Sequence, residues 1–296
     1  MNNQPFPSRR LRIAVLNRHF GYRYGGAERY AAAVVEELAA RHEVHVFAQE
    51  IEHTFPGVNY HHISCPLPKP RWINQLWFAL QTWLRTRQGF DIVHSHENTW
   101  HGHVQTVHVV PVRSSLLQGR SGWRRVFQWA KIAVSLRLVS YLSLEALRFR
   151  ASPNRFVVAV SKPLSDTIEK SYPSTKGRLK TITPGVDLPE ATSAITSRQA
   201  RLNLKLPLDR RIALFVANDP RRKGLDAILQ AMTKTSDDWT LAVAGASHQY
   251  ETYQQVSASL GLGGRVLFLG SLQDISKAYQ AADILLHPTW EDTFAM

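Results

Sequence analysis

The stretch LRIAVLNRHFGYRYGGAERYAAAVVEELAARHEVHVFA, residues 11–48, sets the expectation for the fold. Its apolar run Leu11–Leu16 predicts a buried strand, and after a glycine-containing loop the alanine-rich run Ala27–Ala40 predicts a helix. Val44–Ala48 predicts the next strand. Because parallel strands need a long connection of this kind, the stretch indicates the first unit of a parallel α/β sheet.

Short β-branched runs repeat this pattern along the first half of the chain. They predict strands at Asp91–Ser95, Val104–Val109 and Phe156–Ser161, and most gaps between them are long enough for crossover helices. The segment Leu179–Val186 predicts one more strand and the turn Thr183–Gly185. The segment Asp187–Arg201 then becomes small, polar and weakly periodic. We therefore place a boundary there and expect domains at residues 1–187 and 188–296.

The second half alternates strands and helices in the same way. It predicts strands Ile212–Val216, Thr240–Ala244, Val266–Leu269 and Ile284–His287, and helices Leu225–Met232, Tyr250–Leu260 and Ile275–Ala281. Both halves therefore indicate Rossmann-like, doubly wound parallel-sheet domains. No covering helix follows the last predicted strand, so we expect the second domain to be incomplete in this chain.

The composition favours a globular protein with an anionic partner. Of 296 residues, 44% are hydrophobic, which excludes disorder as the dominant state. The 36 Lys and Arg exceed the 23 Asp and Glu by 13, which favours nucleotide phosphates, nucleic acid or an acidic membrane surface as partner. The single cysteine, Cys65, excludes an internal disulfide and fits a reducing compartment, so we expect a cytoplasmic protein.

Contact with a membrane surface is one interpretation of two aromatic and basic segments, Trp72–Arg87 and Trp123–Leu138. Helices that combine aromatic and cationic side chains suit an anionic membrane, although most such residues in a globular domain belong to the core. No secretory signal is visible, and the uncharged stretch Trp72–Leu84 falls short of the roughly 20 residues that a membrane span needs.

Two turns between strand and helix favour anion binding, one in each half of the chain. Gly25–Arg29 opens the first predicted helix, where backbone amides and the positive helix end favour a phosphate. Pro220–Gly224 precedes a helix of the second half, and its Arg222 and Lys223 suit a diphosphate. Each turn alone could be an ordinary or solvated turn. As a pair at strand carboxyl ends, they predict that the two domains enclose a nucleotide.

Histidines are concentrated between residues 91 and 109. On a strand, His94 with His96, or His101 with His103, share a face and could chelate zinc, but no acidic or cysteine ligand completes a set. His108 ends a predicted strand, at the rim where active-site groups collect. A hydrogen-bonded histidine at a strand end is the alternative interpretation.

An ordered series of motifs spans nearly the whole chain. The motifs are Gly25–Arg29, Asp91–His96, Thr106–His108, Val158–Ser161, Thr183–Asp187, Arg222–Gly224, and Ala282–Asp283 through Pro288 to Asp292–Phe294. The series resembles the retaining, two-domain nucleotide-sugar glycosyltransferases of the GT-B fold, family 4, which include lipopolysaccharide-core glucosyltransferases and phosphatidylinositol mannosyltransferases. The resemblance implies transfer of a sugar from a nucleotide diphosphate to a hydroxyl of a glycan or glycolipid, with the anomeric configuration kept.

The resemblance also assigns roles to residues. It implies catalytic residues His108 and Asp292 and donor-binding residues Gly25, Gly26, Arg222, Lys223, Glu291, Thr293 and Phe294. Asp292 matches the first acid of the Glu-x7-Glu signature, with Glu291 as the alternative register. Neither a metal nor another cofactor is expected, because fixed cations can stabilise the leaving diphosphate. From the single cysteine and the two aromatic and basic segments, we expect a cytoplasmic protein with peripheral contact at the inner face of the membrane.

Three departures from the family pattern qualify these roles. Asn218 replaces a frequent arginine, Ala295 replaces a usual glycine, and the second acid of the signature would follow Met296. We therefore expect residues 1–296 alone to bind the donor weakly or not at all.

Two alternatives to glycosyl transfer remain open. The first is a non-catalytic basic α/β module that binds an anionic membrane or nucleic acid, although no RRM, KH or helix-turn-helix signature supports nucleic acid. The second is a GT-B sugar-nucleotide epimerase or sugar phosphate synthase, since these enzymes use similar phosphate sites.

Overall fold

The computed structural model describes residues 9–22, 24–185, 193–246, 248–272, 274–290 and 292–294. The chain forms two compact units. Unit 1 comprises residues 1–185 and 293–296, and unit 2 comprises residues 186–292. The boundary after residue 187 stays a prediction, because residues 186–192 lie outside the described ranges.

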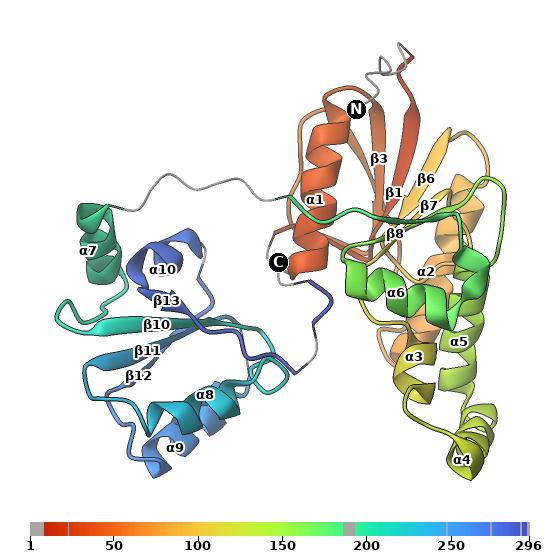
Figure 1. Cartoon of the computed structure of the whole chain (residues 1–296). Coiled ribbons are helices and arrows are strands. Elements are labelled where there is room, and N and C mark those ends of the chain that lie inside the picture. Colours follow the sequence, from red (N-terminus) through yellow and green to blue (C-terminus); the bar gives the residue numbers. More distant parts are fainter. Residues whose placement is uncertain are drawn as a thin grey trace. The chain divides into compact units, whose positions relative to one another are not determined.

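Unit 1 contains a parallel sheet of seven strands in the order β5-β3-β1-β6-β7-β8-β9 (Figure 1). Its strands are β1 (Arg12–Leu16), β3 (Glu43–Ala48), β5 (Val58–His62), β6 (Ile92–Ser95), β7 (Val104–Val107), β8 (Phe156–Ala159) and β9 (Leu179–Thr181). Two short strands, β2 (His19–Phe20) and β4 (Glu50–Ile51), pair with each other. Its helices are α1 (Gly26–Ala39), α2 (Arg71–Thr86), α3 (Val112–Leu117), α4 (Gly122–Ala133), α5 (Leu136–Arg148) and α6 (Lys162–Ser171), with a 3-10 turn at Pro173–Thr175.

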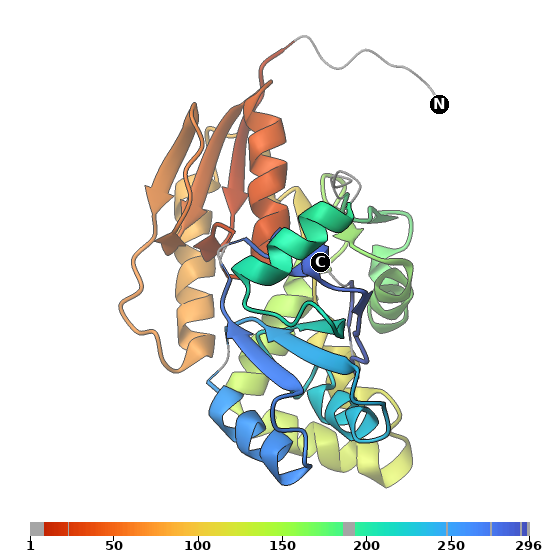
Figure 2. The same ribbon diagram turned by 90° about the vertical axis from the view of Figure 1, so that its left-hand side faces the viewer.

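Both faces of this sheet are buried, and strand alternation explains how. Ile13 and Val15 of β1 belong to the same apolar cluster as Val35 of α1. Ala14 and Leu16 of β1 instead belong to a cluster with Phe78 of α2. Because successive side chains point to opposite faces, the continuous apolar run of β1 serves two helix layers at once (Figure 2).

Unit 2 has a four-stranded parallel sheet in the order β12-β11-β10-β13. Its strands are β10 (Arg211–Val216), β11 (Trp239–Ala244), β12 (Val266–Gly270) and β13 (Ile284–Leu285), and its helices are α7 (Ala194–Asn203), α8 (Leu225–Met232), α9 (Tyr250–Ser259) and α10 (Ser276–Ala281). Phe215 packs with Leu229 of α8 on one face, whereas Leu214 packs with Ala200 of α7 and Ala278 of α10 on the other. Figure 1 shows α8 on one side of this sheet and α7 and α10 on the other.

Several elements differ from the sequence-based expectation. The weakly periodic segment Asp187–Arg201 carries no predicted helix, but helix α7 begins within it at Ala194. Its periodicity is weak because only Ala200 is buried, and a local capping box between Ser193 and Thr196 starts the helix instead. Strand β5 was not predicted, because its half-exposed sequence VNYHH lacks a continuous apolar run. Three strands also end earlier than predicted, since β7 ends at Val107, β8 at Ala159 and β13 at Leu285. Strand β9 ends at Thr181, before the predicted turn at Thr183–Gly185.

Candidate active site

In each unit, polar residues gather where the order of strands reverses. In unit 1 the chain runs from β1 outward to β3 and β5, then returns to β6 on the other side of β1. In unit 2 it runs from β10 outward to β11 and β12, then returns to β13 on the other side of β10. Open α/β sheets bind ligands at such switch points, beyond the carboxyl ends of the strands. Each unit therefore has one candidate site.

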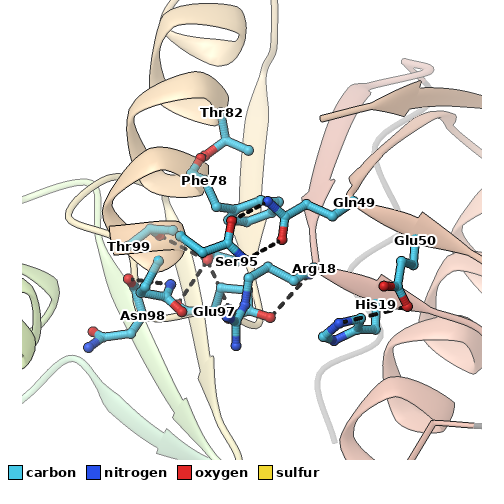
Figure 3. A network of polar contacts seen from close by, with 12 residues as sticks. Arg18, His19, Gln49, Glu50, Phe78, Thr82, Ser95, Glu97, Asn98 and Thr99 are labelled. Atoms are coloured by element: carbon cyan, nitrogen blue, oxygen red, sulfur yellow. Dashed lines mark hydrogen bonds and ion pairs between the residues drawn. The ribbon is translucent and has the colours of Figure 1, made fainter. Parts of the chain in front are cut away.

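An ion pair joins the two loops at the switch point of unit 1 (Figure 3). Arg18, just after β1, places Nε 3.0 Å from Oε2 of Glu97, just after β6, and the Arg18 backbone amide donates to Oε1 at 3.1 Å. The Glu97 amide donates to Oγ of Ser95, which also contacts the Thr99 hydroxyl at 2.9 Å. Because the Glu97 side chain is only 13% exposed, this pair holds both loops in place.

The amino end of α1 carries its own carboxylate. Gly25 is the extended N-cap residue, and Gly26 opens the helix. A Cβ placed on Gly25 would lie 2.8 Å from Oε2 of Glu28, so this carboxylate turns back over the glycine. Burial, followed by the charge of Glu97, raises the pKa of Glu28, against the effects of its own backbone amide, His19 and Arg18. A phosphate at Gly25 and Gly26 would have to bind beside Glu28.

Three histidines cluster beside this helix end. His96 follows β6 and His108 follows β7, and the Nδ1 of His96 lies 3.0 Å from the Nε2 of His108. Their rings stack at 5.3 Å, and Tyr30 of α1 contacts both rings edge-on. The ring of His94 lies 4.4 Å from that of His96, and its Nε2 is 2.7 Å from the Thr106 hydroxyl.

These rings are neutral at pH 7. Burial, then the charges of Arg148 and His94, lowers the pKa of His108 to about 3. Burial lowers the pKa of His94 to about 4 and holds that of His96 well below its usual value. The buried Arg148 donates to the Thr106 carbonyl at 2.7 Å and stays charged, because burial lowers its pKa only to about 10. The cluster is therefore a set of hydrogen-bonding rings beside a buried cation.

Two of the four histidines weighed as zinc ligands hydrogen-bond to groups outside the cluster, whereas both ring nitrogens of His101 are buried without a hydrogen-bond partner among the described residues. His94 contacts Thr106, and His103 Nδ1 accepts a hydrogen bond from the Val93 amide at 2.9 Å. Within the described ranges, no group of three His, Cys, Asp or Glu side chains is arranged to hold a metal ion.

In unit 2, the switch point brings Lys223, Asp292 and His287 together. The Lys223 ammonium donates to the Asp292 carboxylate, and His287 Nε2 lies 3.1 Å from the same oxygen. The side chains of Lys223 and Asp292 are only 18% and 19% exposed, which fixes the pair in place. Arg222 is 58% exposed and pairs with Asp219 at 3.5 Å. Lys223 is therefore the more preorganised cation of the turn.

Gly224 makes this arrangement possible. It adopts φ 87°, and a Cβ there would lie 2.1 Å from the carbonyl oxygen of Pro288. Only glycine tolerates both the left-handed backbone and this close approach. The Arg222 carbonyl also accepts from the Trp290 amide at 3.2 Å, so the loops after β10 and β13 are joined.

The other residues singled out from the sequence lie elsewhere. Thr293 belongs to unit 1 and donates its hydroxyl to the His108 carbonyl, and Phe294 packs against the cluster that contains Val107. Asn218 Oδ1 accepts from the Ala246 amide at 2.9 Å, which gives this departure a structural role. Glu291, Ala295 and Met296 lie outside the described residues.

Several site residues escaped the sequence analysis. His287 ends a predicted strand and Glu97 directly follows the motif Asp91–His96, so position could have indicated both. Tyr30 and Arg148 lie on helices and carry no such signal. Arg148 reaches the site only because α5 packs beside the sheet.

The two doubly wound units, each with a polar site at its switch point, define the GT-B fold, the architecture of one large class of glycosyltransferases. Solved structures share this fold. WaaG, "a glycosyltransferase involved in lipopolysaccharide biosynthesis", superposes with a TM-score of 0.81 at 20% identity, over 95% of this chain and 76% of its own. Anabaena HepE in complex with UDP-glucose superposes with a TM-score of 0.65 at 17% identity, over 94% of this chain and 74% of the HepE chain.

The chain belongs to Glycosyltransferase Family 4, whose family model matches residues 24–190, and the model of Glycosyl transferases group 1 matches residues 197–296. The D-inositol 3-phosphate glycosyltransferase of Mycolicibacterium smegmatis is 25% identical over 70% of this chain and 48% of its own length. That of Corynebacterium aurimucosum is 29% identical over 47% of this chain and 36% of its own. The aligned region thus spans about half the length of these relatives or less.

Proposed function

We propose that the protein is a retaining glycosyltransferase that transfers a sugar from a nucleotide-diphosphate sugar to a hydroxyl of a cell-envelope glycan or glycolipid. The observation that carries the proposal is the cluster of Lys223, Asp292 and His287 at the switch point of unit 2. Membership in Glycosyltransferase Family 4 supports the reaction class. The UDP-glucose bound to the structural neighbour HepE supports a UDP-sugar as the first donor to test.

Lys223 and Arg222 are the cations for the diphosphate. Negative charge grows on the leaving diphosphate as the bond to the sugar breaks, and a cation already fixed in place stabilises that charge without reorganisation. Lys223 meets this condition, because its side chain is largely buried and forms an ion pair with Asp292. Asp292, with Glu291 as the alternative in register, would accept hydrogen bonds from sugar hydroxyls. No metal is required by this arrangement.

His108 supplies a neutral ring to the reacting sugar or the acceptor. Because its pKa is about 3, it acts through hydrogen bonds rather than through a positive charge. Gly25 and Gly26 would offer backbone amides to a phosphate, in competition with Glu28. Thr293 and Phe294 would contribute backbone contacts to the donor, with Thr293 bonded to the strand end that carries His108.

The acceptor is proposed to be a lipopolysaccharide or related envelope glycan at the cytoplasmic face of the membrane. The involvement of the structural neighbour WaaG in lipopolysaccharide biosynthesis supports this class, whereas the names of the curated relatives favour inositol phosphate as a second acceptor. Transfer assays with both acceptors distinguish them.

An exposed helix face supports contact with an anionic membrane. Trp123, Val126 and Phe127 of α4 are 75%, 70% and 69% exposed, at the i, i+3, i+4 spacing of one helix face. Gln128 and Ile132 form its buried side, so the face directed to solvent is apolar. Arg124 and Lys131 lie beside that face at the spacing of the helix. Apolar insertion and lipid phosphates would stabilise such a helix at a bilayer surface.

The second aromatic segment fits this role less well. Phe78 of α2 is fully buried, and Trp72 and Leu76 are half-buried. Among the described residues, no helix is long and apolar enough to cross a membrane.

Vesicle binding tests the membrane contact. Phosphatidylcholine vesicles that contain phosphatidylglycerol should bind the protein, and the double variant Trp123→Ser/Phe127→Ser should lose about tenfold or more in affinity. Ile195→Ser is the matched control, because Ile195 is 81% exposed on α7 of unit 2. Equal binding by the double variant and the control would reject this surface.

Product analysis tests the reaction itself. A glycoside formed from UDP-glucose and an envelope acceptor should keep, by proton NMR, the anomeric configuration of the donor, and an inverted product would reject a retaining enzyme. An epimerised sugar nucleotide without transfer would instead identify the epimerase alternative. RNA affinity that exceeds the affinity for every sugar nucleotide would identify the binding module.

A further inference from the structure

We propose that His96 is a positioning residue that fixes the ring of His108 in one orientation and one tautomer, so that Nδ1 of His108 presents a defined hydrogen-bonding polarity. The inference rests on the proposed function, because it assigns a use to the ring placed beside the reacting sugar. It adds a residue to that site which the motifs did not single out for this role.

The contact between the two rings allows only one proton in the shared bond. His96 Nδ1 and His108 Nε2 are 3.0 Å apart, a distance at which one nitrogen donates and the other accepts. Both rings are neutral, because burial lowers the pKa of each. Each neutral ring carries one proton, so the tautomers of the two rings are linked.

This linkage determines what the outer nitrogens present. If His96 Nδ1 donates, His96 Nε2 is an acceptor and His108 Nδ1 is a donor. If His108 Nε2 donates, both polarities reverse. In the described part of the chain, His96 Nε2 and His108 Nδ1 are buried without a hydrogen-bond partner. The hydrogen-bonding polarity of His108 Nδ1 toward a group that reaches it therefore depends on His96.

The surroundings keep both rings in place. The backbone amide of His96 donates to the Leu16 carbonyl at 3.0 Å, which anchors it to the end of β1. Tyr30 contacts both rings edge-on, and the His108 carbonyl accepts the Thr293 hydroxyl. The facing charged group is Arg148, whose positive charge disfavours protonation of either ring. Rotation of His108 would break its ring hydrogen bond and leave two more buried nitrogens unpaired.

Nitrogen-15 NMR of the histidine rings tests the proposal on the free protein. The chemical shifts distinguish Nδ1–H from Nε2–H, and wild-type His108 should show one tautomer at pH 7. His96→Phe keeps the ring packing but removes the nitrogen, and it should give a mixture or the opposite tautomer. His96→Asn keeps an amide group at the position of Nδ1 and should restore a single tautomer. His103→Asn is the control, because His103 bonds to Val93 instead.

A wild-type mixture of His108 tautomers, or a His96→Phe spectrum identical to wild type, would overturn the proposal. These readouts need neither donor nor turnover, so they stand apart from any failure of the proposed function. Where transfer is measurable, His96→Phe should lower kcat by about tenfold or more with little change in the donor KM, and His96→Asn should recover most of it. Equal losses in both variants would also count against a positioning role.

Discussion

The histidines of this chain lie in different surroundings. The sequence contains 13 of them, and three gather at the carboxyl edge of the unit 1 sheet as buried, neutral rings. The position of His108 at the end of a predicted strand indicated it as a candidate site residue. The pairing with His96 could not be predicted, because it depends on the sheet register that places the ends of β6 and β7 side by side.

Buried neutral histidines make stability depend on pH. His94 has a folded pKa of about 4 against a usual 6.5, so the unfolded chain binds more protons between these values. The free energy of unfolding should therefore rise from pH 4 to pH 6.5 and level off above it. His94→Gln keeps a nitrogen for Thr106 and removes the titration, so its urea denaturation should show a shallower slope. An unchanged slope would contradict the burial of a neutral His94.

A comparison of two glycines distinguishes the cost of backbone strain from the cost of steric crowding. Gly224 and Gly264 have φ of 87° and 78°, but a Cβ meets Pro288 only at Gly224 and nothing within 4 Å at Gly264. Gly264→Ala should cost roughly 1–2 kcal/mol from the left-handed backbone alone. Gly224→Ala should cost at least about 3 kcal/mol, because a backbone carbonyl must also move. Equal midpoints of the two variants in thermal denaturation would show that the loops after β10 and β13 are not packed together.

Elements in this chain were predictable where one apolar pattern covers them. The helix at Leu225–Met232 was confirmed at both ends because four of its residues form a continuous buried face. Helix α7 was missed because a local cap starts it, and side-chain bonds from Arg201 to the Ala281 carbonyl and to Asp283 tie it to distant residues. The site residue Arg148 was missed because its hydrogen-bond partners, Gln105 and Thr106, lie more than 40 residues away in the sequence.

The short helix α3 depends on a buried carboxylate from another helix. Glu145 of α5 accepts hydrogen bonds from the amides of Val112 at 2.6 Å and Arg113 at 3.0 Å, and from the Tyr172 hydroxyl at 2.7 Å. These contacts replace a side-chain cap, and the negative charge suits the helix start.

Removing this carboxylate should destabilise unit 1. Glu145→Ala should cost about 3 kcal/mol, because it leaves two helix amides and a buried hydroxyl without their acceptor. Glu145→Gln retains one oxygen and should cost less. Glu169→Ala, in an exposed position on α6, is the matched control. Urea denaturation checks the order of the three variants, and a Glu145→Ala protein as stable as the control would refute this cap.

At the scale of the whole molecule, the two units repeat one plan. Each sheet reverses strand order once, and each reversal carries charged or titratable groups at the carboxyl ends. The order of motifs predicted the GT-B fold, and the family models and solved neighbours confirm it. The donor-binding residues stay a prediction. Composition could not predict which helix exposes an apolar face, because exposure depends on how α4 packs.

The central claim is that Lys223 binds the diphosphate of a nucleotide-sugar donor. Titration of UDP, GDP and ADP at millimolar concentrations, followed by phosphorus-31 NMR, tests it most directly. Lys234→Ala is the control, because Lys234 is an exposed lysine of the same unit. We predict saturable binding of one nucleotide, which Lys223→Ala weakens by about tenfold or more and Lys234→Ala leaves unchanged. Binding by Lys223→Ala that equals binding by the wild type and by Lys234→Ala would contradict the claim.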